Sequence, residues 1–504
     1  MKIRNRTLVL LVGMLFLNLV KAQETEKPNY LFIFTDDQTY ESIHALNNSE
    51  IYTPNMDRLV DEGVTFTHAF NQGSWSVAVC VASRSMLITG QTVFRAGKNK
   101  SYLEKWAQIE GVEETEVPLW SEVLQKNGYE TYLTGKWHNT DYAALKGFDI
   151  AESIGQGMYE TYDTHGSKEP GYNRGNIHDS EWRPTKKEFA GHWTPQVKDL
   201  IYNEKGEAVI GSPYIAKEHT TELYANNAIN YLLTRGKEIK KPFFMYVAFN
   251  APHDPRQSPQ KYVDMYPTNS IKIPENYLLE HPFDQGDSKG RDELLAPFPR
   301  SKEAVQLHRS EYYAIISHFD HELGRILEAL EASGKKENTY VILTSDHGLA
   351  VGQHGLMGKQ NQYDHSVRMP LLISGPGLRK GKKVAEMVYL QSMFATTCEL
   401  SKIKIPSTVE FKSIANLLTD TTEEAKGEEY IFGAYKGLQR MIRSKDYKLI
   451  IYPEADEYQL FDLNKDSLEK ENLYGKKGYK KITKKLMQQI RLKQEELKDY
   501  IKVL

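Results

Sequence analysis

The chain contains very little cysteine, with only Cys80 and Cys398 among 504 residues. A disulfide-rich secreted scaffold is therefore excluded, because two cysteines can form at most one bridge. Cys398 lies in QSMFATTCEL, where apolar residues recur at helical spacing, and we expect it to be buried as a small hydrophobic side chain. That interpretation leaves Cys80 as a thiol that requires a chemical explanation.

The chain also lacks a strong net charge and a long apolar run beyond its N-terminus. Its 64 basic and 67 acidic residues give a net charge of −3, so no overall field attracts nucleic acid or an anionic membrane. No segment after the first residues is long and apolar enough to span a bilayer. We therefore predict no nucleic-acid partner, and any anion-binding site must be local.

The N-terminus has the pattern of a secretory signal peptide. Three basic residues precede an apolar run at residues 8–20, and small residues follow it, which predicts a signal peptide at residues 1–22. A membrane anchor is the alternative, but the run is shorter than the roughly 20 residues that a bilayer requires. We expect an exported protein, periplasmic or secreted, with no membrane association after cleavage.

Short apolar segments alternate with helical patterns along most of the chain. The expected strands are Asn29–Thr35, Pro242–Asn250, Thr339–Ser345 and Met369–Ser374, and the expected helices are Asn55–Glu62, Leu119–Asn127, Thr220–Thr234 and Leu307–Ser333. This alternation predicts an α/β fold with a large mixed, mostly parallel sheet sandwiched by helices.

The pattern changes after about residue 400. Three short strands joined by turns are expected between residues 440 and 463, and a Lys/Glu-rich helix is expected at about residues 481–501. We therefore expect a smaller C-terminal α+β subdomain with a short antiparallel sheet and a terminal helix. The predicted organisation is a signal peptide at 1–22, a catalytic α/β domain at 23–400 and the subdomain at 401–504.

Polar residues follow three of the predicted strands. Asp36 and Asp37 end the first strand, His253 follows the second, and Asp346 and His347 follow the third. Any one of them alone is explained by a helix cap or a turn, but ligands bind beyond the carboxyl ends of parallel strands, and all three clusters meet there. Clustered carboxylates favour a calcium-like ion, and no closely spaced Cys/His pattern indicates zinc.

Cationic and protonatable side chains accompany these carboxylates. They are Arg84, Lys136, His138, His253 and Lys359. Together they predict a pocket for a small anion with several oxygens, with histidines for general acid and base catalysis. The Cys-x-x-x-Arg spacing does not match the phosphate loop of cysteine phosphatases, and the local signature of papain-like peptidases is absent.

The segment Cys80-Val81-Ala82-Ser83-Arg84, followed by Leu-Ile-Thr-Gly at 87–90, resembles the signature of formylglycine-dependent sulfatases. The resemblance continues in the family's order through TDDQ, TPNMDRL, GYETYLTGKWH, APHDP, TSDHG, GQHGLMGK and LFDLNKD. The chain is thus similar to sulfatases of the alkaline phosphatase superfamily, and more to bacterial polysaccharide sulfatases than to enzymes acting on small aryl esters. The resemblance implies an alkaline phosphatase-like fold and sulfuric ester hydrolysis.

The resemblance also implies a role for each site residue. A maturation enzyme would oxidise Cys80 to formylglycine (3-oxoalanine), and one hydroxyl of the hydrated aldehyde would attack sulfur. One Ca²⁺ would be bound by Asp36, Asp37, Cys80, Asp346 and His347. The catalytic positions would be Cys80, Arg84, Lys136, His138, His253 and Lys359. His347 stands where many members have Asn, and Ala82 where many have Pro.

The expected substrate is a sulfated carbohydrate, because residues 155–219 are rich in aromatic and basic side chains that suit sugar rings and their polar groups. The candidate substrate-binding residues are Arg95, His165, Arg174, His178, His192, Trp193 and Arg256. The sequence leaves open the sugar, the sulfate position, endo or exo action, the oligomeric state and Ca²⁺ versus Mg²⁺.

Two other functions are compatible with parts of this pattern. A phosphate ester or phosphonate hydrolase of the same superfamily would share the metal site, but it would usually carry Ser or Thr as nucleophile. A catalytically inactive protein that binds sulfated glycans would have lost site residues, whereas Cys80, Arg84 and the aspartates are all present.

Overall fold

The computed structural model describes residues 27–103, 117–157, 183–187, 190–287, 289–419 and 425–501. The strands of its largest sheet are β1 (Asn29–Thr35), β2 (Val64–Phe70), β4 (Glu130–Lys136), β5 (Ile150–Gly155), β6 (Gln196–Lys198), β9 (Tyr214–Ile215), β10 (Phe243–Ala248), β11 (Thr339–Ser345), β12 (Arg368–Ser374) and β13 (Lys382–Tyr389). Their spatial order is β13-β2-β12-β11-β1-β10-β4-β5-β6-β9. The four central strands β11, β1, β10 and β4 are separated from one another by helices in the sequence, as an α/β fold requires.

The centre of this sheet is parallel. β11, β1, β10 and β4 are neighbours that all run in one direction, with Tyr30 paired to both Tyr340 and Phe244. β12 runs antiparallel to β11 and to β2, and β5, β6 and β9 extend the other side. The expectation of a large mixed, mostly parallel sheet is confirmed. The carboxyl ends of four adjacent strands therefore lie along one edge.

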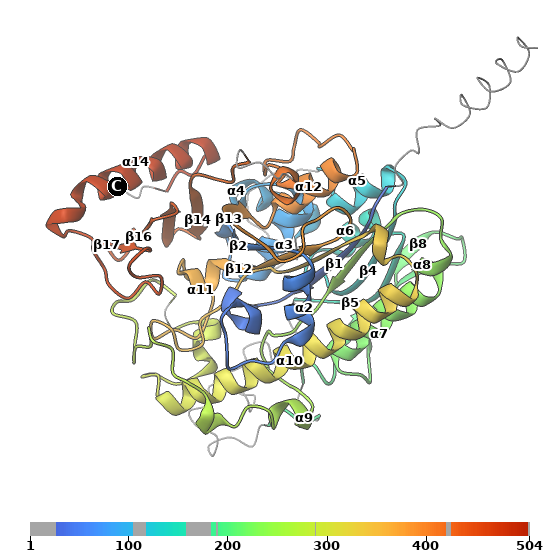
Figure 1. Ribbon diagram of the computed structural model, residues 1–504, viewed down its shortest axis with the longest axis horizontal. Coiled ribbons are helices and arrows are strands. Elements are labelled where there is room, and N and C mark those ends of the chain that lie inside the picture. Colours follow the sequence, from blue (N-terminus) through green and yellow to red (C-terminus); the bar gives the residue numbers. More distant parts are fainter. Residues whose placement is uncertain are drawn as a thin grey trace, which may run out of the picture.

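Helices cover both faces of the sheet. The main ones are α2 (Pro54–Glu62), α5 (Trp120–Lys126), α6 (Asp141–Gly147), α7 (Thr220–Leu233), α10 (Lys302–Ala332) and α12 (Ser392–Leu400). Figure 1 shows α7 and α10 along one side of the strands and α5 and α12 along the other. β1 contributes to the hydrophobic cores on both faces of the sheet, because Leu31 and Ile33 belong to one core and Phe32 and Phe34 to the other. Because both faces of the strand are buried, its sequence is a continuous apolar run.

The long helix α10 begins earlier than the sequence predicts. The apolar pattern placed its start at Leu307, whereas the helix begins at Lys302. The hydroxyl of Ser301 accepts a hydrogen bond from the backbone N–H of Ala304 at 3.1 Å and caps the first turn. Residues 155–219, which are rich in aromatic and basic side chains, contain the short strands β6 and β9 and a hairpin of β7 (Leu200–Tyr202) and β8 (Ala208–Ile210).

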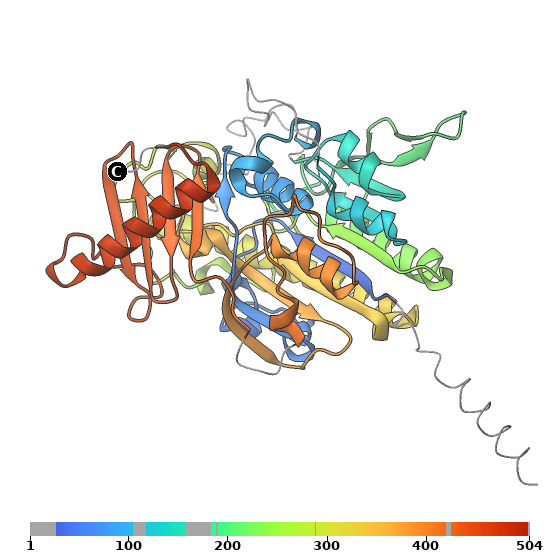
Figure 2. The same cartoon turned by 90° about the horizontal axis from the view of Figure 1, so that it is seen from above.

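A second sheet forms the smaller part of the molecule. It contains β14 (Ile431–Tyr435), β15 (Gln439–Arg443), β16 (Tyr447–Tyr452) and β17 (Glu457–Asp462), all antiparallel, and α14 (Lys480–Leu497) crosses one face of it (Figure 2). The expected short antiparallel sheet with a terminal helix is confirmed. Buried Leu486 and Ile490 attach α14 to the sheet.

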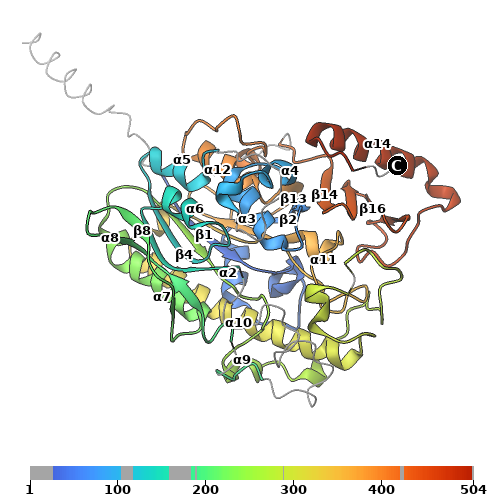
Figure 3. The same ribbon diagram turned by 180° about the vertical axis from the view of Figure 1, so that it is seen from behind.

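The smaller sheet takes one strand from the N-terminal part of the chain. β3 (Gly73–Ser74) pairs parallel to β14, and α3 (Val79–Thr89) follows it directly. Figure 3 shows α3 next to β2 and β13 of the large sheet, with β14 beyond these two strands. The division after residue 400 stays a prediction, since the second sheet is joined to the segment that precedes Cys80.

Both cysteines are free thiols, and Cys398 is buried on α12, as expected from its sequence context. The one conceivable bridge is therefore not formed. No helix within the described residues has both the length and the apolar character needed to cross a membrane. The expected signal peptide at residues 1–22 lies outside the described residues.

Candidate active site

The candidate site lies at the edge where four of the parallel strands, β11, β1, β10 and β4, end. Asp36 and Asp37 follow β1, Lys136 is the last residue of β4, His253 follows β10, and Asp346 follows β11. All five side chains are buried. Since these strands are direct neighbours, residues from four distant parts of the chain converge without any long loop reaching across the sheet.

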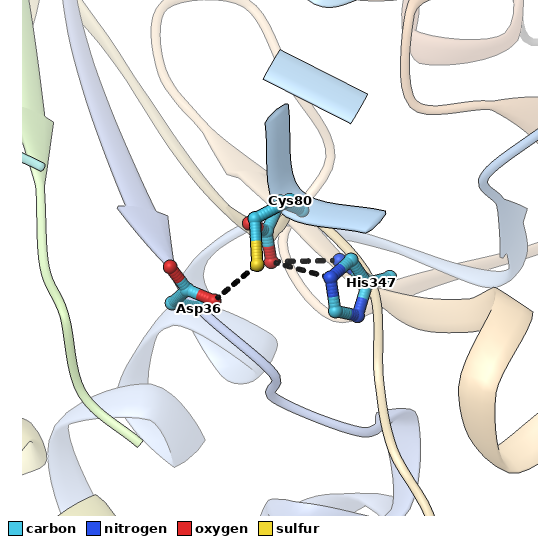
Figure 4. Close-up of side chains that lie close together, drawn as sticks. Asp36, Cys80 and His347 are labelled. Atoms are coloured by element: carbon cyan, nitrogen blue, oxygen red, sulfur yellow. Dashed lines mark hydrogen bonds and ion pairs between the residues drawn. The ribbon is translucent and has the colours of Figure 1, made fainter. Parts of the chain in front are cut away.

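Cys80 approaches this edge from the N-terminal turn of α3. Its Sγ lies 3.3 Å from Oδ1 of Asp36 and 3.2 Å from Nζ of Lys359. Figure 4 shows the Cys80 side chain directed toward Asp36, with the ring of His347 on the other side. The start of a helix carries partial positive charge, which suits a group that handles an anion.

Arg84 lies one turn further along α3 and holds two of the strand ends together. Its Nε donates to Oδ2 of Asp346 and its Nη2 to Oδ2 of Asp36, both at 3.2 Å, and its Nη1 donates to the carbonyl of Lys136 at 2.7 Å. Its guanidinium is fully buried and lies 4.7 Å from the centre of the Phe34 ring. A planar guanidinium can satisfy three acceptors in this way, and a lysine cannot.

Two lysines complete the inner group of charges. Lys359 donates to both carboxylate oxygens of Asp37 at 2.8 Å, and Lys136 forms an ion pair with Asp36. Burial would raise the pKa of Asp36, but the charges of Lys136 and Arg84 outweigh it and hold that pKa well below its usual value. Asp36 is therefore ionised, and its oxygens can serve as ligands.

Asp37 and Cys80 show the opposite behaviour. Burial raises the pKa of Asp37 well above its usual value, and the neighbouring charges of Asp36 and Asp346 add to this against the opposing effect of Lys359. Burial and the charge of Asp36 also raise the pKa of the Cys80 thiol. Three carboxylates in one buried group thus repel one another, which a cation among them would relieve.

The residues present fit a divalent cation. Asp36, Cys80, Asp346 and His347 each offer one ligand atom, and these atoms lie within 4.8 Å of one another. His347 donates from Nδ1 to the carbonyl of Gly348 at 2.7 Å, which leaves the lone pair on Nε2, and Nε2 has no hydrogen-bond partner among the described residues. A second such group consists of Asp36, Asp37, Cys80 and His253. Carboxylate oxygens supply two of the four ligand atoms in each set.

His253 has one ring nitrogen available for chemistry. Its Nδ1 donates to the carbonyl of Asp254 at 2.7 Å, so the proton of the neutral ring is on Nδ1. Its Nε2 lies 3.8 Å from Oδ2 of Asp37 and has no hydrogen-bond partner in the described part of the chain. Burial, with the charges of Lys359 and Lys136, lowers the pKa of His253 well below its usual value.

His138 lies beyond Lys136 in an unusual backbone conformation, with φ of +53°. Its ring is buried, and burial together with the charges of Lys136 and Arg84 lowers its pKa well below the usual value. Gly157 packs against the ring so closely that a Cβ there would lie 2.0 Å from Nε2 of His138. The neutral ring is suited to accept a proton.

The structure places two of the predicted substrate-binding residues, Arg256 and His192, beside the site. Arg256 is buried beside the site, with Nη1 3.1 Å from Nδ1 of His308 and its guanidinium over Tyr312, whose hydroxyl donates to the carbonyl of Asp37. His192 is buried, and its ring nitrogens hydrogen-bond the carbonyl of His253 and the hydroxyl of Thr220. His192 therefore holds the backbone that positions His253.

The remaining candidates of this set lie elsewhere. The indole of Trp193 donates to the carbonyl of Pro184 at 3.0 Å and is half-buried. Arg95 forms an ion pair with Glu410. His165, Arg174 and His178 lie outside the described residues.

Several residues of the site carry no signal in the sequence. Asn71 and Ser83 both donate to the carbonyl of Asp346, at 2.6 and 2.7 Å, and fix the strand end that carries it. Arg291 and Asp292 come from a segment without strand or helix periodicity, and their charges act on the site. Ser83 and Asp254 stand next to Arg84 and His253, which the sequence already indicated, but no pattern assigned a role to either of them.

Comparison with protein families gives two matches. The family model described as Sulfatase matches residues 28–403, and one described as N-sulphoglucosamine sulphohydrolase, C-terminal, matches residues 352–496. The first match includes every residue of the site described above.

Individual relatives match over nearly the whole chain. An arylsulfatase of Clostridium perfringens is 28% identical over 495 residues, covering 95% of this chain and 97% of the relative. An N-acetylglucosamine-6-O-sulfatase of Bacteroides thetaiotaomicron is 25% identical over 550 residues, covering 95% of this chain and 88% of the relative. A solved structure of a protein with its substrate D-glucosamine-2-N,6-O-disulfate superposes with a TM-score of 0.71 and 22% identity, over 94% of this chain and 99% of that one.

Proposed function

The chain belongs to the sulfatase family and is a sulfuric ester hydrolase, and from that premise we propose that it removes sulfate from a sulfated carbohydrate. In this proposal Cys80, oxidised to formylglycine, provides the nucleophile and a calcium ion lies among Asp36, Asp37, Asp346 and His347. The observation that carries it is the position of Cys80 Sγ, 3.3 Å from Asp36 and 3.2 Å from Lys359, inside the group of ligand atoms at the strand ends.

Two groups that this chain would acquire supply the central chemistry. A hydrated aldehyde at residue 80 would offer one hydroxyl to attack sulfur. Its second hydroxyl would lose a proton and re-form the aldehyde, which breaks the carbon–oxygen bond to the sulfate and releases it, so that water need not attack sulfur again. A calcium ion held by Asp36, Asp37, Asp346 and His347 would supply positive charge to polarise that hydroxyl and the sulfate. Both would occupy the space that the buried carboxylates, His347 and Lys359 surround.

The side chains of the site bind and orient the sulfate group. Lys136 and Lys359 provide fixed ammonium groups on two sides of residue 80, and both already pair with its neighbours Asp36 and Asp37. Through its three hydrogen bonds Arg84 fixes the position of α3, and thus of residue 80, relative to the strand ends. Groups fixed before the substrate arrives stabilise the charge that develops on the sulfate oxygens.

Two histidines move protons in this proposal. His253 Nε2 points toward the metal-binding carboxylates with no partner among the described residues, and we assign it the protonation of the departing alcohol oxygen. The negative charge of the bound sulfate ester favours its protonated form. His138, held neutral by burial and by Lys136, accepts the proton from the second hydroxyl of residue 80.

The carbohydrate class of the substrate is supported by two kinds of evidence. The relatives and neighbours include an N-acetylglucosamine-6-O-sulfatase and a complex with a sulfated glucosamine. Arg256, buried beside Tyr312 and His308, is a donor at the same edge of the sheet. We assign the other predicted substrate residues, Arg95 and Trp193, a lesser part, because each is engaged with the protein.

We further propose that the protein is exported and that a maturation enzyme acts on it before it folds. Residues 1–22 have the pattern of a signal peptide. Cys80 is 1% exposed in the folded chain, so an enzyme that oxidises it needs the segment VCVASRSMLITG in an extended state. Oxidation of residue 80 then precedes the folding of the chain around it.

The test is intact-mass analysis and peptide mapping of the protein from a host that contains a maturation enzyme. Conversion of a thiol to an aldehyde lowers the mass of the peptide that contains residue 80 by about 18 Da. Sulfate release from a panel of sulfated sugars is then measured on the same preparation. An unmodified Cys80 in active protein would exclude the proposed nucleophile, and release from aryl sulfate alone would exclude the carbohydrate substrate.

A further inference from the structure

A second pair of carboxylates lies outside the metal-binding group, against two of the catalytic side chains. Oδ1 of Asp254 lies 3.5 Å from Nδ1 of His253. Oδ2 of Asp292 lies 3.7 Å from Nζ of Lys359 and accepts a hydrogen bond from Nε2 of Gln360 at 3.0 Å. Both aspartates thus adjoin the positions where the leaving group and the sulfate are held.

These two carboxylates are buried, and one of their oxygens is left without a partner. Asp254 is 5% exposed and Asp292 is 6% exposed. Oδ1 of Asp254 accepts no hydrogen bond from the described residues. A buried carboxylate oxygen that lacks a donor is unfavourable, and beside a substrate pocket it indicates that the donor belongs to the ligand.

Arg291 supplies a positive charge to the same place. Its Nε lies 3.6 Å from Oδ1 of Asp292, and the charges of Asp292, Cys80 and Asp254 act on it together. Its backbone is in the left-handed region with φ of +52°, which is uncommon for a residue other than glycine. Such conformations persist where the surrounding structure requires them, and they occur at binding sites.

We propose that Asp254, Arg291 and Asp292 form a subsite that binds neutral hydroxyl groups of the sugar next to the sulfate ester. Carboxylates accept hydrogen bonds from hydroxyl protons, and a guanidinium donates to hydroxyl oxygens, so the three side chains match a pair of neighbouring hydroxyls. This inference rests on the proposed function, because it places the sulfate ester beside Lys359 and His253.

The charge of the subsite gives it a second property. The subsite has two carboxylates and one guanidinium, and the nearby ammonium of Lys359 is already engaged by both oxygens of Asp37. A second sulfate or a uronic carboxylate next to the scissile ester would therefore approach a net negative charge. Like charges in a partly dehydrated site repel, and buried polar groups left without their hydroxyl partners are unfavourable as well. The subsite therefore selects an ester with a free hydroxyl at the neighbouring position and rejects a vicinal disulfate.

A purely structural role is the competing explanation, since Asp254 adjoins His253 and Asp292 adjoins Lys359. Loss of either contact would then lower activity on every sulfate ester by the same factor. A subsite lowers activity on sugars that carry the hydroxyl more than on esters that lack it. The ratio between two substrates separates these roles, because effects on His253 and Lys359 cancel in it.

The experiment uses the mature enzyme and three kinds of probe. They are the best monosulfated pyranoside from a panel, its analogues with a deoxy or sulfated neighbouring position, and 4-nitrophenyl sulfate. The variants are Asp254→Asn and Asp292→Asn, with Asp264→Asn as the matched control because Asp264 is exposed on the surface. The readout is kcat/KM for each pair of enzyme and probe.

The subsite predicts three results. The wild-type enzyme prefers the monosulfate over its deoxy and vicinally sulfated analogues by about 100-fold or more. Asp292→Asn and Asp254→Asn each reduce that preference by about tenfold or more, while Asp264→Asn leaves it unchanged. The same two variants lower kcat/KM for the monosulfate more than for 4-nitrophenyl sulfate.

The possible failures point to different errors. Equal losses on all probes in both variants would overturn the subsite and leave the sulfatase function intact. A preference for an analogue with an amine in place of the hydroxyl, or for the vicinal disulfate, would overturn the assignment to hydroxyls. Failure of the mature wild-type enzyme on every sulfated sugar, with 4-nitrophenyl sulfate hydrolysed, would refute the carbohydrate proposal itself.

Discussion

Nζ of Lys359 lies 3.2 Å from Sγ of Cys80, although the two residues are 279 positions apart in the chain. The same ammonium donates to both oxygens of Asp37 at 2.8 Å. Lys359 therefore connects Cys80 on α3, the proposed nucleophile position, to Asp37 after β1, and all three side chains are buried. This contact gives residue 80 a cation on the side where a sulfate oxygen would lie.

The first prediction concerns the nucleophile itself. In Cys80→Ser the side chain has a single hydroxyl, so we expect the enzyme to accept sulfate once and then to turn over at least about 100-fold more slowly than the wild type. Intact mass after incubation with substrate measures the retained sulfate, and steady-state release measures turnover. Multiple turnover near the wild-type rate would contradict the role of the aldehyde.

Cys398→Ala provides the matched control for that substitution. Cys398 is buried on α12 away from the ligand groups described above, so its truncation should cost about 1 kcal/mol of unfolding free energy from a small cavity. The mass of the peptide containing residue 80 and the rate of sulfate release should both match the wild type.

The second prediction tests the guanidinium of Arg84. Arg84→Lys keeps the charge but loses the planar set of donors, and it leaves oxygens of Asp36, Asp346 and Lys136 without a partner in a buried place. We expect a loss of about 3 kcal/mol in unfolding free energy and at least a tenfold loss in kcat. Denaturant unfolding and steady-state kinetics measure the two effects.

Arg95→Lys is the control, because the ion pair of Arg95 with Glu410 is partly exposed to solvent. Its unfolding free energy should change by no more than about 0.5 kcal/mol. Equal effects of the two substitutions would mean that the geometry of Arg84 has no special importance.

The third prediction concerns the cation. A divalent ion that relieves the repulsion among the buried carboxylates should stabilise the fold, by about 2.7 kcal/mol when calcium is present at 100 times its Kd. The midpoint of thermal unfolding should therefore rise when Ca²⁺ is added to chelator-treated protein. A midpoint that is independent of added Ca²⁺ would count against calcium as the ion.

His347→Ala makes this prediction specific to the site. The substitution removes Nε2, the imidazole atom without a partner among the described residues. Calcium titration followed by calorimetry should show at least about tenfold weaker binding. The exposed variant Asp264→Asn should bind calcium as the wild type does.

The fourth prediction concerns the glycine that precedes Lys136. Gly135 has φ of +98°, and a Cβ there would lie 1.7 Å from the carbonyl oxygen of Ala248 on the neighbouring strand. Gly135→Ala must push β4 and β10 apart, and we expect a loss of about 3 kcal/mol or more and a large drop in activity.

Gly128→Ala separates backbone strain from this clash. Gly128 has a similar φ of +91°, but nothing lies within 4 Å of its Cβ position. Its substitution should therefore cost only about 1 kcal/mol and leave sulfate release unchanged. Thermal and denaturant unfolding of both variants measures the difference, and equal losses would show that strain alone decides.

The fifth prediction is a pH dependence of stability. Burial lowers the pKa of His354 to about 4, and its Nε2 donates to the carbonyl of Glu469 at 3.0 Å. The same side chain titrates near 6.5 in the unfolded chain, so the unfolded state binds a proton that the folded state does not take. Stability therefore decreases as the pH is lowered from about 6.5 to about 4.

Denaturant unfolding of His354→Gln at pH 7 and pH 5 tests this linkage. The loss of stability between the two pH values should be smaller than in the wild type by about 1–2 kcal/mol. His321→Gln, which changes a histidine at the surface, should retain the wild-type difference. An unaltered difference in His354→Gln would exclude His354 as a source of acid sensitivity.

The amino-acid sequence by itself determined the layered architecture and the inner part of the candidate site. The apolar runs at Asn29–Thr35 and Thr339–Ser345 coincide with β1 and β11 as the structure has them. A strand that is buried on both faces has a continuous apolar sequence, and ligand-binding residues directly follow the carboxyl ends of such strands. Both patterns are visible in a short stretch of sequence. Cys80 and Arg84 were visible because their spacing of one helical turn is local too.

Only the tertiary structure decided how the loops beyond the strands complete that edge. Lys359 reaches Cys80 from an irregular loop, and Arg291 and Asp292 come from a segment without periodicity. β3 joins the smaller sheet although it is far from β14 in the sequence. The positions of such residues depend on how loops pack over a finished scaffold, which no local pattern encodes.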